Sequence, residues 1–142
     1  MAAGPYFLGI DAGQTVVKAV LHDHRMQKVA VARGASPNHT PAARQVERSH
    51  DDLWGAARGA VQEVLGLSGV NPSDVQAIGV TGHGDGLHLV DAVGEAVGPA
   101  IMAVDSRAWR EREEILADPE RSETILRLSG QVPFLGSPGI ML

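Results

Sequence analysis

The chain has 142 residues and a formal net charge of −5 at pH 7, with 44% hydrophobic and 20% charged residues. This composition is typical of one ordinary globular domain and argues against whole-chain disorder. The lack of a basic excess makes nucleic acid a poor partner, and the lack of cysteine excludes disulfides and thiolate metal sites. Because the N-terminus has no signal-peptide pattern and no apolar run could span a bilayer, we expect a cytoplasmic location without membrane contact.

The first half of the chain predicts a three-stranded meander followed by a helix. Apolar, partly β-branched runs separated by tight turns predict the three strands. Residues 34–50 lack an apolar pattern and are expected to form a loop. Apolar residues then recur at helical spacing from Leu53 to Leu65, and Gly66 and Gly69 are expected to end the helix. The expected strands are residues 7–10, 16–21 and 28–33, and the expected helix is residues 51–65.

The second half predicts further strands and two helices. Residues 75–80 read as a buried strand, residues 87–90 and 100–104 as short strands, and residues 91–98 as a hairpin turn. Tight turns make the first three strands antiparallel, whereas the crossover helix makes the strand after it parallel to a neighbour. The fold class is therefore α/β, with a mixed sheet and flanking helices. The expected helices are residues 105–116 and 120–128.

The tight turn from Asp11 to Thr15 could cradle a phosphate. Gly13 allows close backbone approach, so that successive amides could form an anion-binding concavity. Thr15 offers a hydroxyl, Lys18 a cation and Asp11 a carboxylate able to hold magnesium through water. A plain hairpin turn with a polar tip is the favoured interpretation of this motif alone. The sequence contains neither a Walker A loop nor a dinucleotide-binding fingerprint.

Two later loops also follow predicted strands. In the loop at residues 81–86, three alternating glycines leave His83 and Asp85 as groups that could hydrogen-bond a small polar ligand. A flexible turn with two solvated polar residues explains this loop equally well. Asp105 is explained as a helix N-cap, and Arg107 either reaches a cleft or lies on a solvated helix face. The histidines show no metal-ligand spacing.

Together these segments resemble the FGGY family of carbohydrate kinases. Residues 7–21 resemble the opening phosphate loop of that family, residues 79–91 its first sugar-binding loop and strand, and residues 99–107 a segment that supplies further substrate contacts. The tail at residues 129–142 is similar to the Gly-x-Pro-bearing segment of the family. The opening motif is shared with the wider sugar kinase, actin and chaperone ATPase superfamily. The Gly-His-Gly-Asp-Gly loop looks closest to the L-xylulose and erythritol kinase branches.

The resemblance implies a ribonuclease-H-like domain of the actin-like ATPase superfamily, here incomplete. It also implies transfer of the ATP γ-phosphate to a sugar hydroxyl with Mg²⁺. Asp11 would orient magnesium-bound water, and Lys18 would support the phosphate loop. Gln14 stands where many members have threonine. The implied nucleotide-binding residues are Gly13, Gln14, Thr15 and Lys18, and the implied substrate-binding residues are His83, Gly84, Asp85, Asp105 and Arg107.

Family members are several-fold longer than this chain. The resemblance therefore implies that residues 1–142 are a truncated N-terminal, substrate-binding domain, inactive alone, without the general base and the second, nucleotide-binding domain. The expected substrate is a small sugar or polyol, either a ketopentose such as xylulose or L-xylulose, or erythritol, and a homodimer is left open. Two alternatives are a superfamily member with different chemistry that uses residues 11–18 for nucleotide only, and a standalone sugar-binding or interaction module.

Overall fold

The computed structural model describes residues 4–141, which form two compact units. Unit 1 comprises the described residues up to Pro37 together with His50–His83. Unit 2 comprises Asn38–Ser49 together with the described residues from Gly84 onward. The chain therefore passes from unit 1 to unit 2, returns to unit 1 and ends in unit 2.

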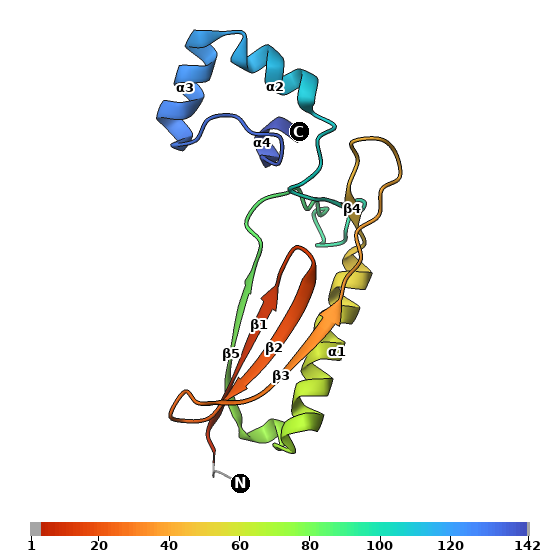
Figure 1. The fold of residues 1–142 in the computed structure, drawn as a ribbon, viewed down its shortest axis with the longest axis vertical. Helices are drawn as coiled ribbons and strands as arrows, with labels where there is room; N and C mark the ends of the chain where they lie inside the picture. Colours follow the sequence, from red (N-terminus) through yellow and green to blue (C-terminus); the bar gives the residue numbers. More distant parts are fainter. Residues whose placement is uncertain (1–3, 142) are drawn as a thin grey trace. The chain divides into compact units, whose positions relative to one another are not determined.

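Unit 1 is a four-stranded mixed sheet with one helix packed against it (Figure 1). The strand order is β3-β2-β1-β5, in which β1 pairs antiparallel with β2, β2 antiparallel with β3, and β1 parallel with β5. This confirms the predicted meander and the predicted parallel strand, which needs the crossover that α1 supplies. The elements are β1 (Tyr6–Ala12), β2 (Val16–His22), β3 (Lys28–Ala35), α1 (His50–Ser68) and β5 (Val75–Gly82).

The core of unit 1 lies between the sheet and α1, which packs mainly on β2 and β3. Strand alternation sends every second side chain to the helix face. Helix and sheet lie in close contact at Gly34, where an added Cβ would overlap the carbonyl group of Ala56. The buried core residues are Tyr6, Leu8, Ala19, Leu21, Ala32, Ala60, Val64 and Val70.

The end of α1 differs from the sequence-based expectation. Gly66 lies inside the helix, and the prediction that it helps to end α1 was wrong. Gly69 does end it, with a φ of 64° and an N–H that donates to the Leu65 carbonyl at 3.0 Å. Its left-handed conformation is one that glycine adopts without steric cost. Trp54, expected on the apolar face, is exposed on α1.

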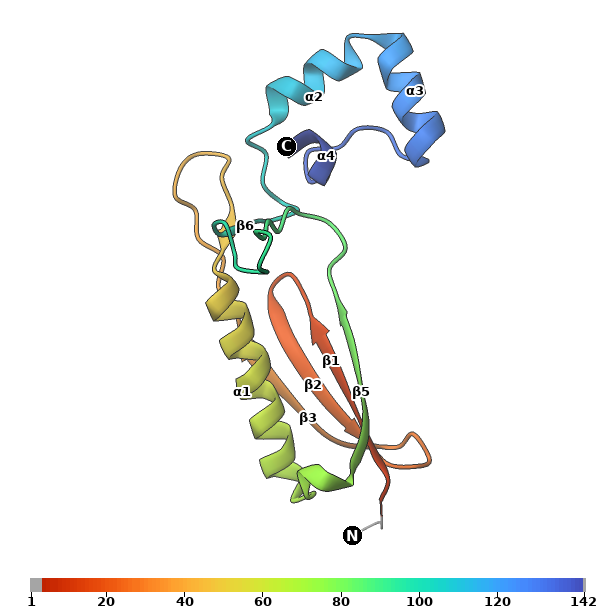
Figure 2. The same cartoon turned by 180° about the vertical axis from the view of Figure 1, so that it is seen from behind.

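Strand β5 forms with its predicted direction but not with its predicted burial. It is an edge strand, and Figures 1 and 2 show it on the far side of the sheet from β3. Ile78 is 61% exposed and Val80 is 72% exposed. The apolar run predicts a strand correctly, but it cannot show which strands the single helix will cover.

Unit 2 combines a short two-stranded sheet with three helices. β4 (Glu47–Arg48), inside the expected loop at residues 34–50, pairs antiparallel with β6 (Ala100–Ile101). The expected strand at residues 87–90 was wrong, because only isolated bridges form there, whereas the expected hairpin turn forms with Asp91 N–H donating to Glu95 C=O. The helices are α2 (Trp109–Leu116), α3 (Pro119–Ser129) and α4 (Pro138–Met141).

Local signals set the ends of α3. The Asp118 side chain accepts a hydrogen bond from the Arg121 N–H at 3.1 Å, and Pro119 follows as the first helical residue. Gly130 ends the helix with a φ of 74°. None of the helices within residues 4–141 is long and apolar enough to cross a membrane.

The contact between Gly34 and α1 yields the first prediction. Gly34→Ala should lower the free energy of unfolding by about 1–3 kcal/mol, because its Cβ would force β3 and α1 apart. Gly59→Ala is the matched control, since a Cβ at this position in α1 meets nothing within 4 Å. It should raise the same free energy by about 0.5–1 kcal/mol. Urea unfolding followed by circular dichroism measures both, and equal midpoints would contradict the packing described.

Candidate functional site

In unit 1, parallel pairing brings the ends of β1 and β5 side by side. Asp11 is in register with Thr81, and Ala12 with Gly82. Beyond the strands, the His83 N–H donates to the Ala12 carbonyl at 3.4 Å, and His83 Nδ1 lies 3.3 Å from the same oxygen. The turn after β1 and the loop after β5 therefore leave the same end of the sheet. In open α/β sheets, ligands bind at the carboxyl ends of parallel strands.

At this end of the strands, two glycines lie so close to neighbouring backbone that a side chain would not fit easily. A Cβ on Gly13 would lie 2.9 Å from the Val16 carbonyl oxygen, so the hairpin between β1 and β2 accepts no side chain there. A Cβ on Gly82 would lie 3.2 Å from the Ala12 carbonyl oxygen. Both glycines thus have a structural reason that is independent of any ligand. Gln14 is half-buried and Thr15 exposed at the tip of the turn.

Asp11 and Lys18 form an ion pair across β1 and β2. They are direct neighbours in the antiparallel register, and Lys18 Nζ lies 3.7 Å from Asp11 Oδ2. Both side chains are nearly half exposed. A pair this exposed contributes only about 0.2–1 kcal/mol to stability. The ion pair therefore holds the Asp11 carboxylate only weakly, and the carboxylate stays accessible to a ligand.

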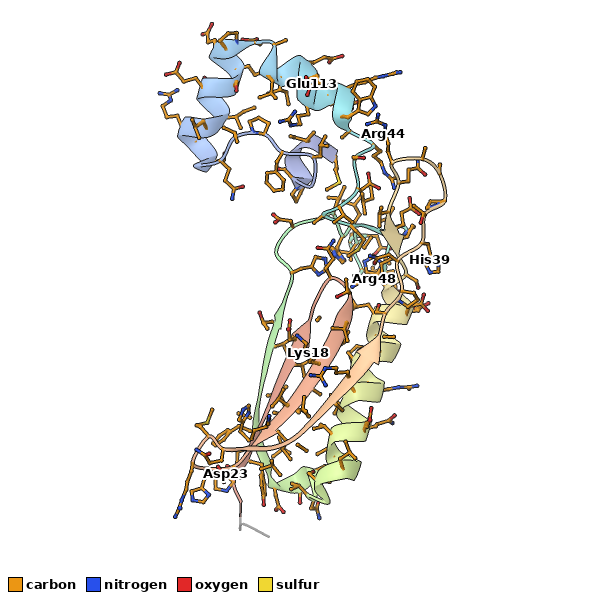
Figure 3. All side chains as sticks on the ribbon, in the orientation of Figure 1. Lys18, Asp23, His39, Arg44, Arg48 and Glu113 are labelled. Atoms are coloured by element: carbon orange, nitrogen blue, oxygen red, sulfur yellow. The ribbon has the colours of Figure 1, made fainter. Side chains whose placement is uncertain are left out.

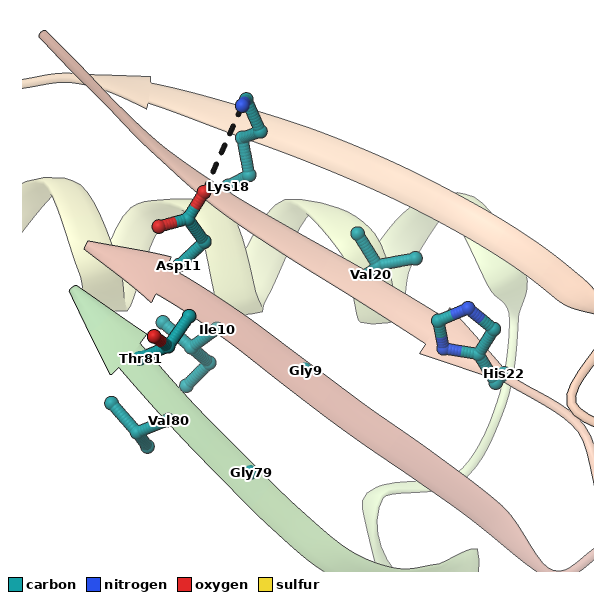
Figure 4. Close-up of a pocket in the computed structure, with 9 residues that line it drawn as sticks. All are labelled: Gly9, Ile10, Asp11, Lys18, Val20, His22, Gly79, Val80 and Thr81. Carbon is teal, nitrogen blue, oxygen red and sulfur yellow. Dashed lines mark ion pairs between the residues drawn. The ribbon is translucent and has the colours of Figure 1, made fainter. Parts of the chain in front are cut away.

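The ion pair lines a shallow pocket of about 380 Å³ on the sheet (Figure 4). Figure 4 shows Asp11, Lys18 and Thr81 at one end of this pocket and His22 at the other. Between them the floor is small and apolar, and Gly9 and Gly79 carry no side chain to fill it. The pocket thus combines a polar end at the tips of the strands with a flat surface along them.

The lining of this pocket is compatible with a magnesium ion that takes most of its ligands from phosphate and water. Among residues 4–141, no group of three or more histidine, aspartate or glutamate side chains is placed to hold a metal. Asp11 is the one carboxylate that lines the pocket. Mg²⁺ in phosphate-transfer sites commonly takes one or two carboxylates and completes its octahedron with phosphate and water. A single exposed carboxylate matches that chemistry.

In unit 2, Asp105 is the centre of a buried polar cluster. Asp105 is only 1% exposed, and its carboxylate accepts hydrogen bonds from the Val46 N–H at 2.6 Å and the Arg107 N–H at 2.8 Å. The Arg107 guanidinium donates to it through Nε at 3.0 Å and Nη2 at 2.8 Å. Nη2 also donates to Glu47 Oε1 at 2.7 Å. The cluster ties the segment around β4 to the loop after β6.

This geometry corrects the interpretation of Asp105 as a helix N-cap. Helix α2 begins at Trp109, and the residue before it, Ala108, makes no side-chain cap. Burial alone would raise the pKa of Asp105. The Arg107 side chain and the N–H groups of Arg107 and Val46 outweigh it and hold that pKa below its ordinary value. The hydrogen bonds from Arg107 to Asp105 in turn raise the pKa of the guanidinium.

The sequence did not predict the roles of Glu47, which belongs to this cluster, or of the neighbouring Arg48. Glu47 lies sixty residues from Arg107 in the chain. In the sequence it is simply an acidic residue within an expected loop, and nothing there indicates that it binds Arg107. Arg48, labelled in Figure 3, is fully buried. Its Nε and Nη2 both donate to Asn38 Oδ1, at 3.1 and 2.9 Å. Burial lowers the pKa of Arg48. No local pattern predicts a buried arginine, because its partner is set by tertiary structure.

The loop from Gly84 to Gly86 also belongs to unit 2. Gly86 has a φ of 99°, and a Cβ there would lie 2.8 Å from the Ile101 carbonyl oxygen. Its N–H donates to the Gly136 carbonyl at 3.2 Å, which fixes the end of the loop. Asp85 and Gly84 are exposed, so the one carboxylate of this loop is open to solvent.

The structure and the sequence were compared with those of known proteins. The structure resembles a solved structure described as a "xyloylose kinase" from Brucella ovis, with a TM-score of 0.81, 28% identity, and coverage of 93% of this chain and 26% of that one. The sequence is 32% identical over 104 residues to a "Probable L-xylulose kinase" of Haemophilus influenzae and 38% identical over 103 residues to a "Glycerol kinase" of Halorhodospira halophila. These matches cover 73% and 72% of this chain.

The mixed sheet with its crossover helix is thus the α/β fold of sugar kinases in the actin-like ATPase superfamily, as expected. The model of the FGGY family of carbohydrate kinases, N-terminal domain, matches residues 6–142, and the chain belongs to this family. It spans about a fifth of the length of the curated relatives named above, 21% and 20% respectively.

The buried cluster predicts how unit 2 responds to acid. Asp105→Asn should lower the free energy of unfolding by about 2–3 kcal/mol at neutral pH, because it removes the charge that holds Arg107. Since the folded-state pKa of Asp105 is depressed, this stabilisation is complete above its ordinary pKa of 3.8. It is lost as the pH falls from there through the folded-state pKa.

The difference in melting temperature between the natural chain and Asp105→Asn should therefore shrink as the pH falls below that value. A Trp54→Phe background leaves Trp109 as the one tryptophan, so that its fluorescence reports on unit 2. A difference that is absent, or constant from neutral to acid pH, would contradict the role of Asp105.

Proposed function

We propose that residues 1–142 form the substrate-binding N-terminal domain of an ATP-dependent kinase that phosphorylates a hydroxyl group of a small sugar or polyol. The observation that carries this proposal is the shared strand end in unit 1. There the exposed Asp11 carboxylate and the glycine turn stand beside the start of the loop after β5. The phosphate loop and the sugar loop of the family correspond to these two segments. A second, nucleotide-binding domain and the general base would lie outside these residues.

The chemistry required of such a domain is positioning and charge neutralisation, because phosphoryl transfer demands little covalent work from the protein. The amides of Gly13, Gln14 and Thr15 would face the phosphates of ATP. Asp11 would hold the magnesium ion through water, and Lys18, 3.7 Å away, would fix the Asp11 carboxylate. Magnesium-bound ATP would supply the phosphoryl group and the cation that neutralises its charge.

On the sugar side, His83, Gly84 and Asp85 would line the substrate. Asp85 is exposed and is suited to accept hydrogen bonds from neighbouring hydroxyls. Arg107 is partly exposed and would also contact the substrate. Asp105 is buried under Arg107, so we assign it the role of holding that guanidinium rather than touching the sugar.

The substrate class we propose is a ketopentose, with xylulose and L-xylulose as first candidates, or a short polyol such as erythritol. The similarity to a protein named L-xylulose kinase supports the ketopentose, and the similarity to a protein named glycerol kinase supports the polyol. Cytoplasmic ATP would be the phosphoryl donor, and the cysteine-free chain suits that reducing compartment.

Ligand-induced stabilisation tests the sugar site. The melting temperature of the chain should rise with one of the pentuloses or polyols, because a ligand that binds the native state stabilises it. Asp85→Ala should remove this shift, lowering affinity about tenfold or more. Glu95→Ala is the control, because Glu95 is a comparably exposed carboxylate on a turn of the same unit. Unchanged binding in Asp85→Ala would leave Asp85 a turn residue.

The phosphate loop is tested with nucleotide. Addition of magnesium and ATP should shift the amide resonances of Asp11, Gly13 and Thr15 in an NMR titration. Lys18→Met should weaken the effect, whereas Lys28→Met, an exposed lysine on β3, should not. Phosphorylation of the sugar by a longer form of the chain would establish the kinase. Sugar binding without phosphorylation in every form would point to the binding module, and no binding of sugar or nucleotide would refute the proposal.

A further inference from the structure

Three segments of unit 2 meet at a tightly packed junction beside the loop at residues 84–86. Gly86 packs against the backbone of residues 101–103, where a Cβ on Gly86 would lie 2.8 Å from a carbonyl oxygen. Gly136 packs against the same stretch, because a Cβ there would overlap the Ala103 carbonyl group. The Gly86 N–H also donates to the Gly136 carbonyl at 3.2 Å. The loop, the end of β6 and the tail of the chain are therefore held together by their backbones.

Asp85, the carboxylate proposed to bind the sugar, stands directly before this junction. The Asp85 carbonyl and the Gly86 N–H belong to one planar peptide group. The hydrogen bond from that N–H to Gly136 thus fixes the orientation of the whole group. Beyond Gly86, the Leu87 N–H donates to the Ile101 carbonyl at 2.8 Å, and the Ile101 N–H donates back at 2.9 Å. The chain is therefore anchored immediately after Asp85.

The Asp85 side chain has no support of its own in the described part of the chain. It is exposed, and among residues 4–141 it makes no hydrogen bond or ion pair. A Cβ at Gly84 would meet nothing within 4 Å, so the loop is open on the side before Asp85. The position of the carboxylate is therefore set by the anchored backbone after it. Whatever holds this backbone decides which hydroxyl groups the carboxylate reaches.

The turn that bears the accepting carbonyl is closed on itself and tied to α2. The Ser137 N–H donates to the Phe134 carbonyl at 3.0 Å, which closes the turn at residues 134–137. Just before the turn, the Pro133 carbonyl accepts a hydrogen bond from Arg112 Nε at 3.2 Å. Because Arg112 lies on α2, the helix holds the tail of the chain, and the tail holds the loop.

We propose that the turn at residues 134–137 positions Asp85 for the substrate, with Gly136 and Arg112 as the positioning residues. This role rests on the proposed function, in which the loop after β5 binds the sugar. Neither residue touches the sugar, because Gly136 acts through the Gly86 N–H and Arg112 acts through the turn. The turn bonds to the one peptide group that directly follows the carboxylate, which is the contact that positioning requires.

Sugar affinity in a Gly136→Ala variant tests this proposal, with xylulose, L-xylulose and erythritol as probes. The added Cβ would push the turn away from Ala103 and break the hydrogen bond from Gly86. The dissociation constant of the sugar that binds should therefore rise about tenfold. Gly139→Ala is the matched control and should bind like the natural chain, since a Cβ there meets nothing within 4 Å. Isothermal titration calorimetry measures both, and equal affinities would overturn the proposal.

A double-mutant cycle with Asp85→Ala separates positioning from a general loss of structure. If Gly136 acts through Asp85, Gly136→Ala should change the sugar affinity by less than about twofold once the carboxylate is absent. A purely structural effect would weaken binding by the same factor with and without the carboxylate. Equal factors in the two backgrounds would therefore overturn the positioning role.

Arg112→Met is a second variant, and it introduces no steric overlap with the backbone. It removes the hydrogen bond to Pro133 and should raise the sugar dissociation constant about threefold, because the turn is no longer tied to α2. Arg110→Met is the control on the same helix and should leave the affinity unchanged, since the Arg110 guanidinium lies over the Trp109 ring. Unchanged affinity in Arg112→Met would overturn the role of Arg112.

Hydrogen exchange tests the junction without any ligand. The Gly86 amide should exchange faster in Gly136→Ala and in Arg112→Met than in the natural chain, because both changes weaken its hydrogen bond. Unchanged exchange in both variants would overturn the proposal. If no sugar binds the natural chain, the proposed function is refuted and the positioning role with it. If sugar binds the natural chain and Gly136→Ala equally well, the proposed function stands and only the positioning role is overturned.

Discussion

The parallel pairing of β1 with β5 is the constraint on which the candidate site depends. An antiparallel neighbour would have placed the loop after β5 at the opposite end of the sheet from Asp11. The crossover through α1 makes the two strands run in the same direction, and the register sets Asp11 beside Thr81. The His83 hydrogen bond to Ala12 extends this pairing beyond the strands. Two chain segments that are 71 residues apart in the sequence thereby lie side by side.

Unit 2 is organised by a different interaction. The Asp105 carboxylate, buried and saturated by N–H donors, extends the contact between the segments of β4 and β6 beyond their short two-stranded pairing. Burying a carboxylate is costly, and the cost is offset here because Arg107 and backbone amides satisfy its oxygens. Glu47 adds the second carboxylate that fixes the guanidinium. The guanidinium of Arg107 is thereby held in one orientation, which the proposed contact with substrate would require.

The sequence predicted the meander, the crossover helix and the parallel strand, because apolar periodicity and turn residues are local signals. It also predicted the glycine turn after β1, where the reason is steric. The sequence-based predictions failed for residues whose environment is formed by segments distant in the chain. Val75 to Val80 read as buried, yet burial requires a helix above β5, and α1 covers other strands. Asp105 read as an N-cap, yet its partners are the Val46 amide and Arg107. Whether the predicted site residues bind ligands stays a prediction.

By itself, then, the sequence determined the meander, the crossover helix and the strand after it, the tight turn after β1, and which family the motifs resemble. These properties depend on neighbouring residues and on steric limits within a few positions. Only the tertiary structure decided that Asp11 lies beside Thr81, that Asp105 is buried beneath Arg107 and Glu47, and that α1 covers β2 and β3 rather than β5. Each of these depends on which distant segment fills the space around a residue, and no local pattern of amino acids encodes that.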